Sequence, residues 1–143
     1  MAIIDRNASW YQIDKDEEVS IGISLPLSLS DVNSTKTTIE AVKQNLLNLC
    51  NTEAGERVMQ PNLGTRLKRF IFEPFSEEIV VQIQDVLMEG LTYWLPFIRV
   101  NSIDVKMSEE GRGDFRNTLE ISVDFSLLKD LTTTESIQIT IGA

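Results

Sequence analysis

The 143-residue chain contains no histidine and one cysteine, and each shortage excludes certain kinds of catalytic or metal-binding site. Without histidine there is no Ser–His–Asp triad, no histidine general base and no imidazole ligand for a metal ion. A single cysteine can form neither an internal disulfide nor a cysteine-rich zinc site. Cys50 lies in an apolar helical pattern, which predicts a buried structural thiol. We therefore expect no catalytic residues, no metal ligands and no bound cofactor.

Positive charge is also scarce. The chain has 13 lysines and arginines against 22 acidic residues, a formal net charge of −9. A surface that binds nucleic acid needs clustered cations, so we expect no nucleic-acid partner. The densest basic group is Arg66, Lys68 and Arg69. It either meets an acidic partner or forms one solvated turn of helix.

Long apolar runs and a basic leader are absent as well. The first ten residues, MAIIDRNASW, do not resemble a signal peptide, and no stretch is apolar enough to insert into a membrane. We expect synthesis in a reducing cytoplasm. Length and an ordinary composition indicate one globular domain over residues 20–143, preceded by a polar arm, residues 1–19, that is loosely held.

Hydrophobic periodicity divides the chain into strands and helices. Residues 20–30 alternate with a period of two, with Pro26 at an edge or a bend. Residues 98–107, 115–127 and 137–141 are also strand-like, and a phase change between Val100 and Ile103 indicates a bulge. The glycine-rich stretch around Arg112 is expected to be a hairpin turn. These patterns predict an antiparallel C-terminal meander.

Two helices are expected, over residues 35–51 and 75–93. Thr37 and Glu40 have the spacing of a capping box, and Ser76 is the expected N-cap of the second helix. Pro96 should end that helix. The predicted fold class is α+β, a small antiparallel C-terminal sheet plus an N-terminal strand packed on two main helices.

The segment NTEAGERVMQPNLGTRLKRFIFEP, residues 51–74, fits neither periodicity. Gly55 and Gly64 lie where a helix ends and a turn reverses, so we expect positive φ at both. Thr65 is the expected cap of a short helix, and Phe72 and Phe75 are expected to anchor the chain in the core. The segment also carries three carboxylates that could serve in glycoside hydrolysis, Glu53, Glu56 and Glu73. Their spacing does not single out a general acid and a nucleophile of a glycosidase. We therefore interpret the segment as a folded connector.

Residues 52–79 resemble the signature of contractile-tail baseplate wedge proteins, the family of the gene-25 product of T-even phages, also called lysozyme-like tail proteins. That signature reads Thr-x-x-Gly-Glu-Arg, Pro-x-x-Gly, an apolar short helix, Phe-Glu and a long helix. The matching positions are Thr52, Gly55, Glu56, Arg57, Pro61, Gly64, Leu67, Phe72 and Glu73. The similarity extends over roughly residues 20–143. Where the family usually carries Glu-Pro-Arg, this chain reads Leu95, Pro96, Phe97, and Arg99 is a candidate substitute cation.

The resemblance implies a structural subunit of the virion, a baseplate wedge protein without enzymatic activity. It implies several copies in a symmetric baseplate, contacts with other wedge and hub proteins, and initiation of the tail sheath by strand addition. The candidate partner-binding residues are Gly55, Glu56, Arg57, Pro61, Gly64, Phe72, Glu73, Pro96, Arg99 and, on the solvent side of the last strand, Gln138. The alternatives are a regulatory anti-adaptor of the same fold family and, from a third class, a peptidoglycan glycosidase.

Overall fold

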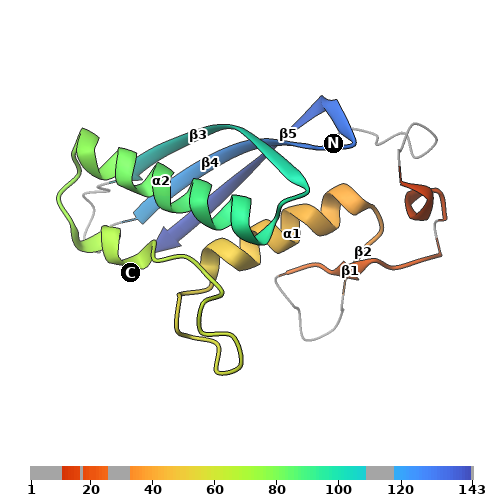
Figure 1. The fold of residues 1–143 in the computed structure, drawn as a ribbon, viewed down its shortest axis with the longest axis horizontal. Coiled ribbons are helices and arrows are strands. Elements are labelled where there is room, and N and C mark those ends of the chain that lie inside the picture. The colour runs from red at the N-terminus through yellow and green to blue at the C-terminus, as the bar shows by residue number, and fades with distance from the viewer. Residues whose placement is uncertain (1–10, 17, 26–32, 109–117, 143) are drawn as a thin grey trace. The chain divides into compact units, whose positions relative to one another are not determined.

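The computed structural model describes residues 11–16, 18–25, 33–108 and 118–142 (Figure 1). The expected bend at Pro26 and the expected turn around Arg112 lie outside these residues. The chain divides into two compact units, residues 1–46 and 47–143. The boundary falls inside helix α1, Thr38–Asn51. The division into an arm and one domain stays a prediction.

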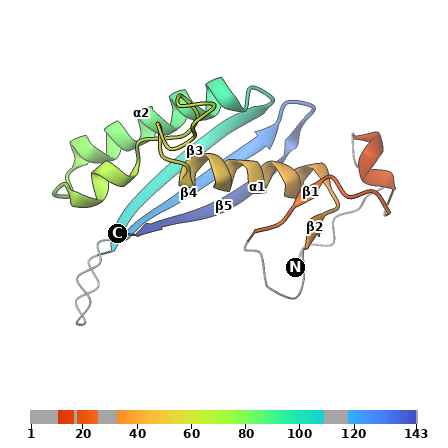
Figure 2. The same cartoon turned by 90° about the horizontal axis from the view of Figure 1, so that it is seen from below.

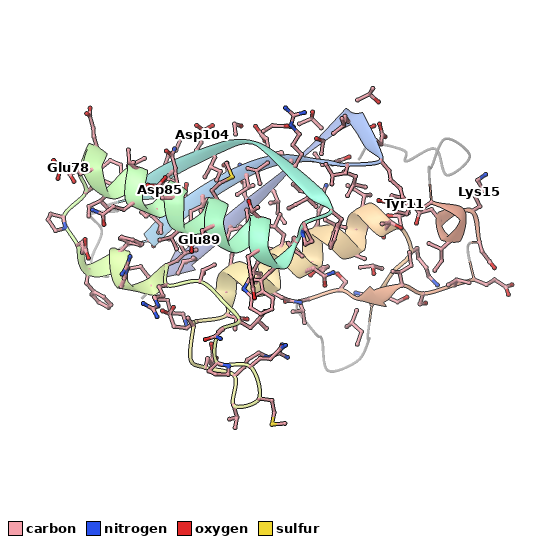
Figure 3. All side chains as sticks on the ribbon, in the orientation of Figure 1. Tyr11, Lys15, Glu78, Asp85, Glu89 and Asp104 are labelled. Carbon is pink, nitrogen blue, oxygen red and sulfur yellow. The ribbon has the colours of Figure 1, made fainter. Side chains whose placement is uncertain are left out.

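The α+β fold class is confirmed. Besides α1, the described residues include helix α2, Glu77–Trp94, and the three C-terminal strands β3 (Ile98–Ser108), β4 (Thr118–Leu127) and β5 (Asp130–Gly142). The three strands form one antiparallel sheet in the order β3-β4-β5, as the C-terminal pattern predicted. α2 lies along one face of this sheet (Figure 2).

The expected strand over residues 20–30 is wrong over its described part. Only β1, Gly22–Ile23, is a strand, and it pairs with β2, Ser34–Thr35, instead of joining the C-terminal sheet. Ile23 and Leu25 are 57% and 43% exposed, so the alternation does not mark a buried face here. A strand extends only as far as its partner's backbone, and β2 offers two residues.

α1 begins at Thr38, three residues later than expected, and the reason is its cap. The Glu40 N–H donates to Thr37 Oγ1 at 3.3 Å, and Glu40 Oε2 accepts from the Thr37 N–H at 3.3 Å. This reciprocal pair is the capping box that the spacing predicted. The same carboxylate also accepts from the Lys36 N–H at 2.9 Å.

A second group holds the start of α1 from 24 residues away. Asp14 lies in a short 3₁₀ helix, η2, Gln12–Lys15, and is buried. Its Oδ1 accepts hydrogen bonds from both the backbone N–H and the hydroxyl of Thr38, each at 2.7 Å. A carboxylate at a helix N-terminus satisfies a backbone donor and is favoured by the helix dipole. Asp14 therefore fastens part of the expected loose arm to α1.

α2 follows its sequence signals closely. Ser76 Oγ accepts from the Ile79 N–H at 3.3 Å, which confirms the N-cap, and Glu77 and Glu78 occupy the first turn. The residues that face inward are buried, namely Ile79, Ile83, Leu87 and Leu91. Leu95 caps the C-terminus through its N–H, 2.9 Å from the Leu91 carbonyl, and Pro96 follows. Gln84 Nε2 donates to the Ile103 carbonyl at 2.8 Å and so ties α2 to β3.

The sheet has one apolar face. β4 buries Leu119, Ile121, Val123, Phe125 and Leu127, and β5 buries Ile137, Ile139 and Ile141, as the alternation predicted. The register of β3 shifts between Val100 and Ser102, which confirms the expected bulge. β5, however, starts at Asp130, so residues that look like a polar turn belong to the strand. They are polar because they are exposed, and the Asp130 carboxylate accepts from the hydroxyls of Thr132 and Thr133 just after the true turn.

We predict that Asp14→Ala lowers the free energy of unfolding by about 1–2 kcal/mol, because it removes a helix cap and leaves the part-buried Thr38 donors without their acceptor. Asp16→Ala is the matched control, because Asp16 is exposed and accepts only a local bond from the Glu18 N–H. It should change stability by less than about 0.5 kcal/mol. Urea unfolding followed by circular dichroism measures both; equal losses would show that Asp14 is not a specific anchor.

Candidate functional site

The connector loop, which we define as residues 52–67, is closed by its own backbone (Figure 1). Glu53 and Thr65 form a parallel bridge, in which the Thr65 N–H donates to the Thr52 carbonyl at 2.9 Å and the Ala54 N–H to the Thr65 carbonyl at 3.1 Å. Further out, the Gly55 N–H donates to the Pro61 carbonyl at 2.7 Å. The segment is thus a folded connector, as its glycines and prolines predicted.

Both loop glycines have the backbone conformation expected of them. Gly55 has φ +96° and Gly64 has φ +119°, and no non-glycine residue in the described part of the chain has positive φ. The two sites differ in their surroundings. A Cβ on Gly55 would meet nothing, whereas a Cβ on Gly64 would overlap the carbonyl group of Thr52. Gly64 therefore permits both the turn and the close approach of the two ends of the loop.

Glu56 works within the loop. Its Oε2 accepts from the Glu53 N–H at 3.0 Å, and its own N–H donates to the Glu53 carbonyl at 3.0 Å. Glu56, one of the candidate partner-binding residues, therefore makes a contact within the folded loop. The carboxylate closes a turn of the loop, which is a structural use.

The tip of the loop faces solvent. Arg57 and Pro61 are exposed, and between them Val58 and Met59 are 93% and 92% exposed. The tip is nevertheless ordered by hydrogen bonds, because the Gln60 N–H donates to the Arg57 carbonyl at 3.2 Å and the Leu63 N–H to the Gln60 carbonyl at 3.1 Å. Two apolar side chains at an ordered tip are available to a partner.

The short helix that follows differs from the expectation in two ways. It is a 3₁₀ helix, η3, Lys68–Phe72, and it has no side-chain cap. Thr65, the expected cap, donates its hydroxyl to the Cys50 carbonyl at 3.1 Å instead. Thr65 is therefore used to satisfy the end of α1, whose last carbonyls have no partner within the helix.

The expected core anchors Phe72 and Phe75 are also wrong, since they are 77% and 49% exposed. Leu67, Phe70 and Ile71 are buried instead. The reason is the period of the helix: with three residues per turn, Phe72 lies in line with exposed Arg69 and away from Leu67 and Phe70. The spacing of three between Arg69 and Phe72 is the sequence signal that could have revealed the exposure of Phe72, whereas Phe75 lies beyond the end of η3.

Cys50 is buried, as expected, and burial raises the pKa of its thiol to about 12. A thiol that stays protonated at neutral pH is a poor nucleophile. Among the described residues, no three or more histidine, cysteine or acidic side chains are grouped to hold a metal ion. Within the same residues, no helix is both long and apolar enough to cross a membrane.

The candidates at the end of α2 lie on the surface. Pro96 and Arg99 are exposed, and the Phe97 carbonyl accepts from the Leu128 N–H at 3.1 Å, which ties this turn to the β4–β5 hairpin. Arg99 lies on β3 opposite Ser126. Glu73 follows η3, partly buried, with its N–H 3.2 Å from the Phe70 carbonyl.

The polar face of the sheet carries a hydrogen-bonded row across all three strands. Ser102 Oγ donates to Asp124 Oδ2 at 2.7 Å, and the Ser136 hydroxyl bonds the same carboxylate from the other side. These hydroxyls lower the pKa of Asp124, because they favour its charged form. The row spans β3, β4 and β5 and holds their registers in line.

Beyond this row, β5 ends the sheet. In the described part of the chain no strand pairs with the outer edge of β5. Gln138 lies in the middle of this strand, exposed, opposite Ser122. The structure thus places the candidates in three regions, the connector loop with η3, the end of α2, and the β5 edge.

Comparison with known proteins points in one direction. Residues 36–131, about two thirds of the chain, match the family described as baseplate wedge protein gp25. Baseplate protein W of Escherichia phage P2 is 27% identical over 78 residues, which are 54% of this chain and 68% of that protein.

Two solved structures show the same fold. A Geobacter sulfurreducens protein, described provisionally as a tail lysozyme, superposes with a TM-score of 0.62 and 20% identity, covering 82% of this chain and 95% of that one. A chain of the six-fold symmetrised baseplate of the anti-feeding prophage superposes with a TM-score of 0.58 and 24% identity, covering 75% and 82%.

The two loop glycines should differ in their tolerance of a side chain. We predict that Gly55→Ala costs about 1 kcal/mol, from the positive φ alone. Gly64→Ala should cost at least about 2 kcal/mol, because the overlap with the Thr52 carbonyl adds to the strained backbone. Thermal and urea unfolding of both variants measure the difference. Equal losses would mean that the loop shifts to make room at Gly64.

Proposed function

The chain belongs to the baseplate wedge protein gp25 family, and from this premise we propose that it is a structural subunit of a contractile tail, built into the baseplate, that initiates the tail sheath by offering the edge of β5. The membership rests on the match over residues 36–131. On this proposal the protein resides in the tail baseplate of the virion and contacts other wedge and hub proteins. The six-fold baseplate that contains a similar chain supports several copies in a symmetric assembly.

The observation that carries the sheath proposal is the open edge of β5. This strand is 13 residues long, and it pairs with β4 on one side only. An unpaired edge presents backbone N–H and C=O groups that another chain can join as an added strand. Such pairing takes its affinity from the backbone and needs no particular side chain.

The side chains of β5 suit this use. Ile137, Ile139 and Ile141 are buried on the apolar face, whereas Ser136, Gln138 and Thr140 are exposed and polar. The buried isoleucines fix the register of the strand on the sheet. The exposed polar side chains let the strand lie in water while its edge is unpaired. The connector loop and the turn at Pro96 then remain for contacts inside the baseplate.

The regulatory anti-adaptor remains the alternative from another class. A position among tail genes favours the baseplate subunit, whereas an isolated, stress-regulated gene favours the anti-adaptor. The glycosidase alternative draws on the carboxylates Glu53, Glu56 and Glu73 and on the lysozyme name of a protein of similar fold. Against it, Glu56 uses its carboxylate to close a turn.

We predict that the purified protein leaves peptidoglycan intact in a zymogram, and that Glu56→Gln behaves identically. The amide oxygen of glutamine can still accept from the Glu53 N–H, so this variant tests chemistry while it preserves the turn. A clearing band that disappears with Glu56→Gln would replace the structural assignment by an enzymatic one.

Sheath assembly tests the role of β5. We predict that baseplates carrying Gln138→Pro assemble no sheath, because proline removes one backbone donor and fixes φ at an exposed position of the strand. Gln138→Thr is the matched control, since threonine keeps the N–H and favours strands. Circular dichroism and melting temperature check that each variant is folded, and electron microscopy of the particles counts sheathed tails.

A second variant covers the case in which proline unfolds the strand. Lysines at Ser136, Gln138 and Thr140 keep every backbone donor but place charge along the edge, a device that blocks strand addition. Sheath of normal length on both folded variants would contradict docking through β5.

A further inference from the structure

η3 and its flanks expose four side chains at intervals of three residues, Arg66, Arg69, Phe72 and Phe75, which we call the Arg–Phe row. Side chains three apart eclipse one another in a 3₁₀ helix, so Arg69 and Phe72 share one side of η3. The opposite side is formed by Leu67 and Phe70, which are at most 1% exposed. One side of η3, with Leu67 and Phe70, is thus buried, and another side exposes Arg69 and Phe72.

The row is held in place by the core beneath it. The Arg69 guanidinium lies 4.5 Å from the centroid of the buried Phe70 ring, an arrangement that fixes a cation over an aromatic face. Hydrogen bonds brace the turn at both ends, from the Phe70 N–H to the Leu67 carbonyl at 3.1 Å and from the Glu73 N–H to the Phe70 carbonyl at 3.2 Å. η3 also packs against β5. The backbone of η3 and the Arg69 side chain would therefore lose little freedom if a partner bound here.

Among the described residues, no carboxylate forms an ion pair with Arg66, Arg69 or the neighbouring Lys68. The chain as a whole carries 22 acidic residues and a net charge of −9. A compact cationic group on an otherwise acidic protein attracts an acidic partner.

The aromatic residues set the remaining requirement. Phe72, one 3₁₀ turn beyond Arg69, and Phe75, which follows η3, are large apolar side chains left exposed. Aromatic residues and arginine are the residue types that dominate binding energy at protein interfaces. An occupant must therefore bring an apolar group as well as carboxylates, which favours a protein segment over nucleic acid.

We propose that the Arg–Phe row is the docking site for an acidic segment of a neighbouring baseplate subunit, whose carboxylates pair with Arg66 and Arg69 and whose apolar side chain packs on Phe72 and Phe75. The proposal rests on the function proposed above, that the chain is a baseplate subunit. It assigns η3 to contacts inside the baseplate, separate from the β5 edge that is assigned to the sheath.

The direct test places a photocrosslinker, p-benzoylphenylalanine, at Phe72 in baseplates assembled from the tail genes without the sheath gene. Tyr93 is the matched control position, because it is 74% exposed and lies at the other end of α2. Mass spectrometry of the crosslinked peptides should identify an acidic segment of another baseplate subunit at Phe72 and not at Tyr93. A crosslink to a second copy of this chain, to a segment without acidic residues, or to nothing would overturn the proposal.

Charge exchange tests the cations. Arg66→Glu with Arg69→Glu should lower incorporation into these sheathless baseplates at least about tenfold, since paired charges at interfaces account for such differences in affinity. Lys106→Glu, an exposed charge reversal on β3, is the control and should incorporate normally. Lysines in place of the acidic residues of the crosslinked segment should restore the double variant; if they do not, the pairing is not the one proposed.

The two proposals fail differently. If the unaltered chain never enters a baseplate, the proposed function itself is wrong. If it enters normally with both arginines reversed, the function stands and the Arg–Phe row is not the docking site. Because the sheath gene is absent, a defect at the β5 edge cannot imitate either result.

Discussion

The burial of one face of the β3–β4–β5 sheet is the constraint on which the rest of the second unit depends. Leu119, Ile121, Val123 and Phe125 of β4 are all at most 1% exposed. Because side chains alternate along a strand, a slip of one residue would move this whole set into water, so the register is strongly fixed. The opposite face is then necessarily polar, and Asp124 links its three strands through Ser102 and Ser136. A sheet of this kind can leave β5 unpaired at its edge without losing its own order.

Sequence reasoning succeeded where the cause is local. The Thr37–Glu40 box, the Ser76 cap and the positive φ of Gly55 and Gly64 each follow from a few neighbouring residues. The bulge after Val100 was readable because it breaks a short period. The apolar faces of β4 and β5 were readable for the same reason, since a period of two repeats over many residues.

Sequence reasoning failed where the cause is distant along the chain or where two hydrophobic periods compete. Nothing near Thr38 indicates that Asp14, 24 residues earlier, completes its cap. Residues 20–25 alternate, but the strand with which they pair in the described chain, β2, is two residues long. The length of that partner depends on another part of the chain. Phe72 and Phe75 were assigned to the core because phenylalanine is usually buried. The 3₁₀ period of η3 decides otherwise for Phe72, because it aligns that residue with the exposed Arg69, whereas Phe75 lies beyond the end of η3.

The connector loop explains how a signature rich in carboxylates and glycines can be structural. Glu56 is used by its own turn, and Gly64 lets the loop return against Thr52. That return leads the chain into η3, which packs against β5. The Arg–Phe row proposed for contacts inside the baseplate and the β5 edge proposed for the sheath therefore belong to the same compact unit of the fold.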